Sequence, residues 1–311
     1  MIASAPGKVV VWGEYAVLAG APAAVMAVDR RATCEISSHP ALSSYSSSGF
    51  LSAAVHTPDK RAPKAPVASL LRAVMTQLDT AEIHEHLRWH FDTRPFFDGG
   101  SKLGLGSSAA LCCAIYACLC DLLDHKPVWQ EALEAHKQWQ GGGSGLDIAC
   151  SWHGGVIRFQ QGACAPFVWP EDWRFVLCNT GQSASTQAHV NRFSAWQGAE
   201  KDKSVNVLGQ ASAALFQSDP TLDALGVYIE ALRALDQAGS LNIFSPEHES
   251  LATIASGAGL LYKPCGAGGG DIGIAISDSP ARLDEFYMRA AQAGFGPLDM
   301  EIAVDGIQTR A

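Results

Sequence analysis

The stretch that most constrains the fold is residues 101–123, where a glycine- and serine-rich turn is followed at once by an apolar run. From Ser107 to about Leu123 the sequence is apolar on nearly all sides, which predicts a helix buried in the centre of the molecule. The preceding Gly104-Leu105-Gly106-Ser107-Ser108 holds two glycines and two serines, where one of each would serve a turn and a helix cap. Glycine lets a backbone approach a ligand, and the first N–H groups of a helix favour an anion. Taken alone, this stretch fits either a phosphate site or a capped loop.

Two further glycine-rich segments each end in an aspartate. In residues 141–147 (GGGSGLD), Asp147 could meet a ligand as a base, or it could cap a helix beginning at Ile148. Residues 263–271 (KPCGAGGGD) predict a turn that lies against a ligand or against another backbone. Lys8 adds a cation at the start of a strand. Three such segments in one chain favour a shared ligand site over three unrelated turns.

The composition narrows the class of protein. A length of 311 residues predicts two domains or one large α/β unit, and the net charge of −9 argues against nucleic-acid and anionic-membrane surfaces. No stretch reaches the ~20 apolar residues of a spanning helix. The nine cysteines include no C-x-x-C pair, and four lie in the apolar run after Ser108. They predict reduced thiols in a cytoplasmic protein.

Hydrophobic periodicity predicts an α+β architecture, with helices on one face of a sheet in the second half of the chain. We divide it into an N-terminal domain of residues 1–160 and a C-terminal domain of residues 161–311. Residues 38–50 have the composition of a polar loop. The expected strands are 8–12, 23–28, 87–92, 156–159, 175–179, 272–276 and 300–304. The expected helices are 66–79, 107–123, 129–139, a short one after Asp147, 204–216, 220–238, 246–258 and 280–294.

The order of the segments resembles that of the GHMP small-molecule kinases. The resemblance rests on APGKVVVWGEYAVLAG near the N-terminus, then KLGLGSSAA, GSGLDIA and KPCGAGGGD. It implies an N-terminal α+β domain with a left-handed βαβ crossover and a C-terminal ferredoxin-like domain, with the active site between them. It also implies ATP and Mg²⁺ as cofactors.

Within this superfamily the details are most similar to the phosphomevalonate kinases. Tyr15 stands where mevalonate kinases tend to have histidine, and His136 stands where they typically have a Mg²⁺-binding glutamate. Residues 179–186 (NTGQSAST) resemble a hydroxyl-rich segment near the substrate phosphates. The implied reaction transfers the γ-phosphoryl group of ATP to 5-phosphomevalonate. Mevalonate kinase, another GHMP kinase, and a catalytically silent ligand sensor of the same fold are the alternatives.

The resemblance also implies roles for single residues. Lys8 and Lys102 would neutralise phosphate charge, and Asp147 would orient Lys8 or Mg²⁺ more than act as a strong base, because a phosphomonoester acceptor is already mostly ionised. Ser107 would lie nearest Mg²⁺. The nucleotide phosphates would be held by Gly104, Leu105, Gly106, Ser107, Ser108 and Ala109. The acceptor side would include Tyr15, His136, Ser144, Gly145, Ser185, Thr186, Gly266, Ala267 and Gly268.

One departure concerns the turn before the central helix, where the proline usual in the family is replaced by Gly100-Ser101. The expected partner is a small phosphorylated molecule, with no nucleic acid and no membrane. The chain is expected to be a monomer or a homodimer.

Overall fold

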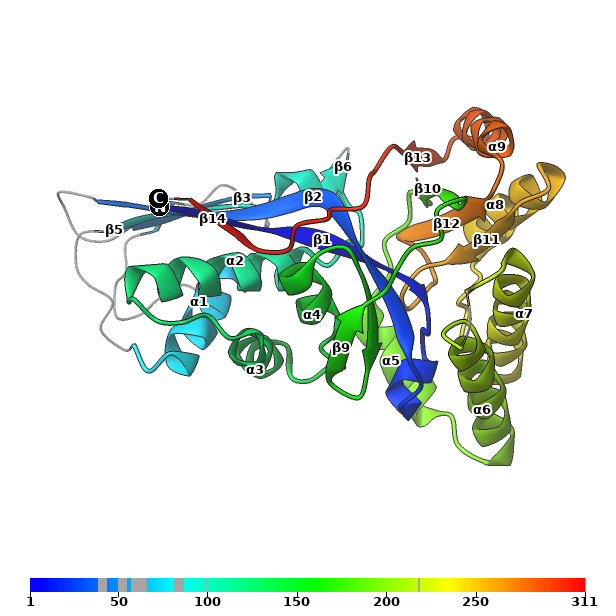
Figure 1. Ribbon diagram of the computed structural model, residues 1–311, viewed down its shortest axis with the longest axis horizontal. Coiled ribbons are helices and arrows are strands. Elements are labelled where there is room, and N and C mark those ends of the chain that lie inside the picture. The colour runs from blue at the N-terminus through cyan, green and yellow to red at the C-terminus, as the bar shows by residue number, and fades with distance from the viewer. Residues whose placement is uncertain are drawn as a thin grey trace.

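The computed structural model describes residues 1–38, 44–49, 55–56, 66–80, 87–98, 100–217 and 219–310. Two sheets organise these residues (Figure 1). An eight-stranded sheet has the order β14-β1-β2-β5-β3-β4, with β8 and β9 attached to β2, and a four-stranded sheet has the order β11-β12-β10-β13. The N-terminal half of the chain forms most of the larger sheet, and the C-terminal half forms the smaller one.

The long strand β2 (Ala23–Ser38) organises the larger sheet. On one side it pairs with β1 (Ile2–Trp12) in antiparallel register. On the other side its first residues pair with β8 (Val156–Gln160) and its last residues pair with β5 (Leu87–Asp92). The expected strands at 8–12 and 23–28 are therefore confirmed but too short. The remaining members are β3 (Ser44–Ser48), β4 (Val55–His56), β9 (Ala163–Pro166) and β14 (Gln308–Arg310).

Helices cover one face of this sheet (Figure 1). Central among them is α2 (Ser107–Leu122), in which every residue from Ala109 to Cys120 is buried. It packs against β1 and β2 on one side and against the neighbouring helices on the other. Those neighbours are α1 (Pro66–Gln77), α3 (Trp129–Gln140) and α4 (Leu146–His153). The prediction of a buried central helix is confirmed, and its four cysteines are free thiols, like the other five.

The smaller sheet is antiparallel throughout. It consists of β10 (Arg174–Asn179), β11 (Leu261–Pro264), β12 (Ile272–Ser277) and β13 (Gly296–Leu298). Two helices contact its strand β11, namely α7 (Leu222–Gly239) and α8 (Pro246–Gly257), and Figure 1 shows both on this side of the molecule. The other helices of this half are α6 (Ala199–Ala214), α9 (Pro280–Gln292) and α5 (Thr186–Ala195). Hydrophobic periodicity in the sequence did not predict α5, β11, β13 or β14.

The predicted strand at 300–304 is wrong. Residue Ile302 makes only an isolated bridge to Val28. Along this edge of β2, only the few residues between the part paired with β8 and the part paired with β5 are free to bind another segment. Residues 300–304 cross β2 there and form two backbone hydrogen bonds with it, from the Asp29 N–H to the carbonyl of Glu301 and from the Ala303 N–H to the carbonyl of Ala27. The chain then continues to β14, which pairs with β1.

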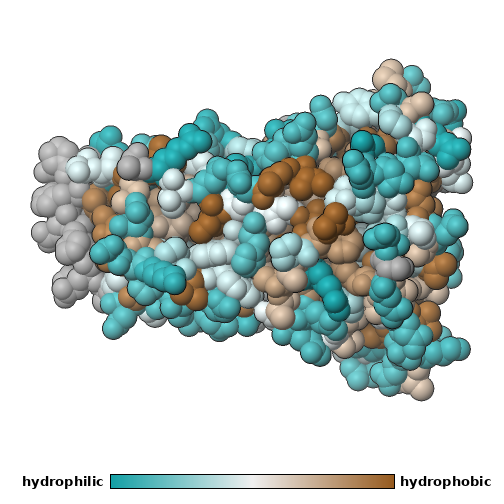
Figure 2. Space-filling view, in the orientation of Figure 1, coloured by the Kyte–Doolittle hydropathy of each residue, from teal (hydrophilic) through white to brown (hydrophobic). Residues whose placement is uncertain are grey.

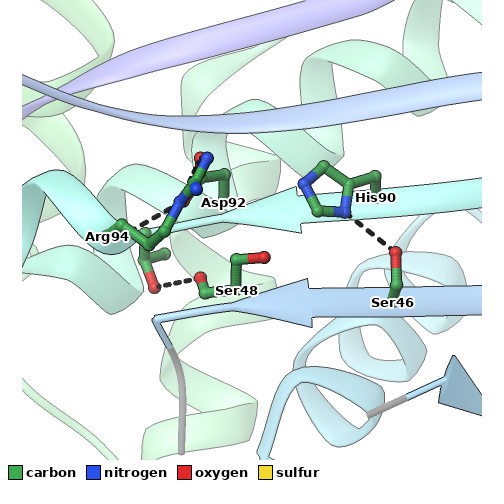
Figure 3. A network of polar contacts seen from close by, with 6 residues as sticks. Ser46, Ser48, His90, Asp92 and Arg94 are labelled. Atoms are coloured by element: carbon green, nitrogen blue, oxygen red, sulfur yellow. Dashed lines mark hydrogen bonds and ion pairs between the residues drawn. The ribbon is translucent and has the colours of Figure 1, made fainter. Parts of the chain in front are cut away.

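The prediction of a polar loop at 38–50 is also wrong where it can be checked, because Ser44–Ser48 form β3, parallel to β5. Figure 3 shows why a serine-rich segment can serve as a strand here. The Ser46 hydroxyl lies 2.8 Å from Nδ1 of His90 on the neighbouring strand, and the hydroxyl of Thr93 donates to the carbonyl of Ser48 at 3.3 Å. Residues 39–43 and 50 of this prediction lie outside the described residues.

Short elements connect these strands: the 3-10 helices η1 (Ala16–Ala19) and η2 (Arg94–Phe96), and the hairpin of β6 (Phe97–Asp98) and β7 (Ser101–Lys102). We propose that the expected domains, 1–160 and 161–311, are the units built on the two sheets, with β9 and β14 returning to the first sheet. The face in Figure 2 is mostly hydrophilic, with a small group of hydrophobic residues near the middle. Among the described residues, no helix combines the length and the apolar character that crossing a bilayer requires.

Candidate active site

Lys8 lies on β1 beside the glycine-serine turn. Its backbone N–H donates to the carbonyl of Leu105 at 2.8 Å, which fixes the turn against the strand. Gly106 occupies the N-cap of α2 with φ +75°, and a Cβ there would lie 2.9 Å from Cε of Lys8. Glycine is therefore required at 106 both by the backbone and by the lysine side chain. The turn brings the lysine to the N-terminus of the central helix.

Asp147 faces Lys8 from the first turn of α4. Its Oδ1 lies 3.2 Å from Nζ of Lys8. The cap position belongs to Gly145, at φ +88°, and the helix begins at Leu146, so the reading of Asp147 as the cap of a helix from Ile148 is wrong. Burial lowers the pKa of Lys8 and the Asp147 carboxylate raises it, and the net direction is upward. The lysine therefore remains an ammonium group at neutral pH.

The two serines of the turn have different surroundings. The Ser107 hydroxyl is buried and finds no hydrogen-bond partner among the described residues, whereas the Ser108 hydroxyl lies 3.3 Å from Nε2 of His136. Burial lowers the pKa of His136, which keeps its ring neutral. Mg²⁺ takes oxygen ligands and retains much of its shell as water and substrate phosphate. The Ser107 hydroxyl, which has no hydrogen-bond partner in the described part of the chain, is an oxygen that could serve as a ligand to Mg²⁺ in this way. Within the described ranges, no cluster of three or more His, Cys, Asp or Glu side chains could hold a metal.

A cavity of about 340 Å³ lies between the two halves of the chain. It is lined from both halves, and most of the predicted site residues take part. From the first half these are Lys8, Tyr15, Gly104, Leu105, His136, Ser144, Gly145 and Asp147. From the second half they are Thr186, Gly266, Ala267 and Gly268.

Six predicted site residues are not among those that line the cavity: Lys102, Gly106, Ser107, Ser108, Ala109 and Ser185. Ser107 to Ala109 form the first turn of α2, which begins two residues after the lining residue Leu105 in the sequence. Ser185 is the N-cap of α5, and its hydroxyl accepts from the N–H of Ala188 at 3.3 Å. The hydroxyl of Ser185 is thus engaged as a helix cap, and of these two neighbouring residues Thr186 is the one that lines the cavity.

Tyr15 joins the two halves at the cavity. Its hydroxyl donates to the carbonyl of Ala267 at 2.5 Å, its ring lies 5.0 Å from that of Phe193, and its backbone adopts φ +60°. Burial raises its pKa. The Tyr15 hydroxyl is thus already hydrogen-bonded to the glycine-rich loop at residues 266–270, while Tyr15 also contributes to the cavity wall.

Beside Tyr15, Glu14 forms a buried ion pair with Lys263 of β11. The second carboxylate oxygen of Glu14 accepts from the hydroxyl of Tyr228 at 2.6 Å, and the Tyr228 oxygen accepts from the N–H of Gly13 at 2.8 Å. Both side chains of the pair are at most 2% exposed. Neither this pair nor Asp271, which lines the cavity, was predicted from the sequence as part of the site. The sequence did hold a signal for Asp271, because it follows a glycine-rich run at 266–270 just as Asp147 follows the glycine-rich run at 141–145.

Comparison with known proteins places these features in one family. The model of the GHMP kinases N terminal domain matches residues 70–155, which include the glycine-serine turn and Asp147. A phosphomevalonate kinase from Streptomyces sp. (strain CL190) is 29% identical, with 99% of this chain and 98% of the relative covered. Residues 70–155 of the chain match the N-terminal domain of the GHMP kinases, and nearly the whole chain is similar to a phosphomevalonate kinase. The GHMP kinases are a family of phosphotransferases.

Other GHMP kinases share parts of the sequence or the fold. A mevalonate kinase from Pyrococcus abyssi (strain GE5 / Orsay) is 29% identical over 61% of this chain and 60% of the relative. The fold matches that of Streptococcus pneumoniae phosphomevalonate kinase in complex with phosphomevalonate and AMPPNP. The TM-score is 0.77 at 19% identity, with 97% of this chain and 99% of that chain covered. The chain therefore has the two-sheet α+β fold expected from its motifs, and this fold is shared with GHMP kinases.

Proposed function

We propose that this chain transfers the γ-phosphoryl group of ATP to a phosphate oxygen of 5-phosphomevalonate, giving 5-diphosphomevalonate and ADP. The observation that carries the proposal is the Lys8–Asp147 pair at the N-terminus of α2, on the wall of a cavity shared by both halves. A phosphomevalonate kinase that aligns with nearly the whole chain supports this choice of acceptor.

The chain's own residues would act mainly through charge. The first N–H groups of α2 lack partners within the helix and favour the nucleotide phosphates. Lys8, held as an ammonium ion by Asp147, neutralises charge that develops between donor and acceptor. Mg²⁺, with Ser107 as a protein ligand, would supply further neutralisation.

The acceptor needs no strong base. A phosphomonoester with a second pKa near ~6 is largely a dianion at neutral pH, so its oxygen can attack without first losing a proton. The bond from the γ-phosphorus to the β,γ-bridging oxygen breaks, a new P–O bond forms to the acceptor, and ADP leaves. Asp147 would then serve to orient Lys8, as their 3.2 Å separation suggests.

The experiment is a coupled assay of ADP release with Mg²⁺ and four acceptors: 5-phosphomevalonate, mevalonate, galactose and homoserine. We expect turnover with 5-phosphomevalonate alone, and loss of that turnover in the Lys8→Met variant. Turnover with mevalonate only would refute the assigned acceptor. Binding of 5-phosphomevalonate without ADP release would instead favour a silent sensor.

A further inference from the structure

Asp271 combines a strained backbone with a side chain in the active-site cavity. Its φ of +54° lies in the left-handed region, where glycine is unstrained and other residues are uncommon. Four of the five residues before it are glycines, so the chain places a side chain at the position of the loop where a further glycine would fit the backbone best. Such strain persists where the surrounding contacts stabilise it.

Those contacts first join Asp271 to the segment before α5. The N–H of Asp271 donates to the carbonyl of Gln182 at 2.7 Å, and its own carbonyl accepts from the N–H of Thr180 at 2.9 Å. Its carboxylate accepts from the N–H of Ala184 at 3.3 Å. Asp271 therefore fixes the segment that leads to Thr186 on the cavity wall.

On its other side Asp271 packs against the glycine-serine turn. A Cβ at Gly104 would lie 2.6 Å from the Cβ and 2.8 Å from Oδ2 of Asp271. The absence of a side chain at Gly104 is what lets the carboxylate reach the turn. One residue thus contacts both the turn at α2 and the segment at α5, which come from opposite halves of the chain.

Its charge acts on the cations of the site. Burial raises the pKa of the Asp271 carboxyl, opposed by the Ala184 N–H and by the charges of Lys102 on β7, Lys8 on β1 and His189 on α5. Lys102 is exposed at the end of β7, opposite Phe97 of β6, yet the surrounding protein lowers its pKa. Among the nearby charges, Asp271 raises the pKa of Lys102 the most and Asp147 raises it less, whereas Lys8 lowers it.

We propose that Asp271 is a positioning residue for phosphoryl transfer, which docks the 180–184 segment against the glycine-serine turn and supplies a carboxylate beside Gly104, two residues after Lys102. The inference rests on the proposed kinase activity. It assigns Asp271 no contact with the reacting atoms. It predicts that Asp271 and Lys102 act as one unit in catalysis.

The test measures kcat, KM for ATP and the unfolding midpoint in Asp271→Asn, Asp271→Gly, Lys102→Met and the double variant Asp271→Asn with Lys102→Met. The matched control is Asp278→Asn, an exposed aspartate after the other end of β12. We expect both Asp271 variants to lose roughly 10–100-fold in kcat, the size of effect that a misplaced group produces. The KM for ATP should not rise, because a negative charge near the phosphates has been removed.

Three readouts separate positioning from a loss of structure. Asp271→Gly suits the backbone and should retain the wild-type unfolding midpoint while losing kcat. The double variant should be no slower than Lys102→Met alone, since the two residues act as a unit. The alkaline limb of the rate profile should move to lower pH in Asp271→Asn, because Lys102 loses the carboxylate that raises its pKa. Additive losses in the double variant, or wild-type kcat in both Asp271 variants, would overturn the inference.

The assay also distinguishes this inference from the proposed function. If the wild-type protein phosphorylates a different acceptor, the same series is run with that acceptor, and only the proposed function fails. If the wild-type protein turns over none of them, calorimetric titration with AMPPNP and Mg²⁺ decides. If the Asp271→Asn variant binds AMPPNP as tightly as the wild-type protein or more tightly, the assignment of Asp271 as a negative charge near the phosphates is supported. Weaker binding of AMPPNP contradicts it.

Discussion

The buried ion pair between Glu14 and Lys263 permits a sharp prediction about stability. In Lys263→Met, the Glu14 carboxylate would remain in a site where its side chain is 2% exposed, and among the described residues only the Tyr228 hydroxyl would still donate a side-chain hydrogen bond to it. Removing one partner of such a pair typically destabilises a protein by about 3–5 kcal/mol, because a buried charge is left uncompensated. For a chain of this size, with about 2–4 °C per kcal/mol, the midpoint of thermal unfolding should fall by roughly 6–20 °C.

The double variant Glu14→Gln with Lys263→Met removes both charges and keeps an amide oxygen to accept from Tyr228. Replacing both members of a buried pair is often neutral or stabilising, so the double variant should recover most of the stability lost in the single one. The assay is urea unfolding followed by circular dichroism, with thermal unfolding alongside. The control is Arg289→Met, which breaks an exposed pair with Glu285 and should cost no more than about 1 kcal/mol. A Lys263→Met variant within about 1 kcal/mol of wild type, or a double variant less stable than the single one, would refute this reasoning.

Three further predictions concern the site and its surroundings. Asp147→Asn and Lys8→Met should each lower kcat by ~10²-fold or more in the ADP assay, since each removes part of the charge arrangement for the transition state; near-wild-type rates in both would mean that the site is elsewhere. Gly106→Ala should lower kcat/KM for ATP by at least ~10-fold, through its φ of +75° and its contact with Lys8. Gly100→Ala, at φ +87° with nothing within 4 Å, should not, although it shares the backbone strain. The buried His248 has a pKa lowered by burial to about 4, against about 6.5 when unfolded, so the native state loses about 3 kcal/mol as pH falls through that range. In urea unfolding at pH 7.5 and 5, His248→Gln should reduce the difference between the two pH values, and an unchanged difference would contradict this assignment.

The parts of the fold that could be predicted are those whose own sequence decides them. The helix from Ser107 is apolar on all sides and has glycines before it, and the structure begins α2 at that serine. By contrast, β3 has the serine-rich sequence of a loop and is a strand because β5 and β4 supply its pairing partners. The segment at 300–304 is apolar enough for a strand, but the unpaired edge of β2 is so short that the segment forms only a single β-bridge with it. Pairing partners distant in the sequence decided both cases.

The same distinction applies to the site. Lys8, Asp147 and the glycine-serine turn are in motifs that stand out locally, and the structure brings them together. Ser185 stays a prediction: a hydroxyl near a motif can also serve as a helix cap, and the structure shows this second use in its bond from the Ala188 N–H. The ion pair between Glu14 and Lys263 forms because the two halves of the chain pack together, and the sequence around either residue does not predict that packing.

The free cysteines form a set of chemical reporters at different depths. Those of α2 are fully enclosed, and burial raises the pKa of the Cys112 and Cys113 thiols, so alkylation there requires the central helix to come away from its neighbours. Cys265 lies on the cavity wall, where burial raises its pKa to about 12 and a bound ligand would shield it. Cys164 is partly exposed on β9. Labelling rates at these thiols therefore report, without any engineered probe, global opening at α2, occupancy at Cys265 and the reactivity of an accessible thiol at Cys164.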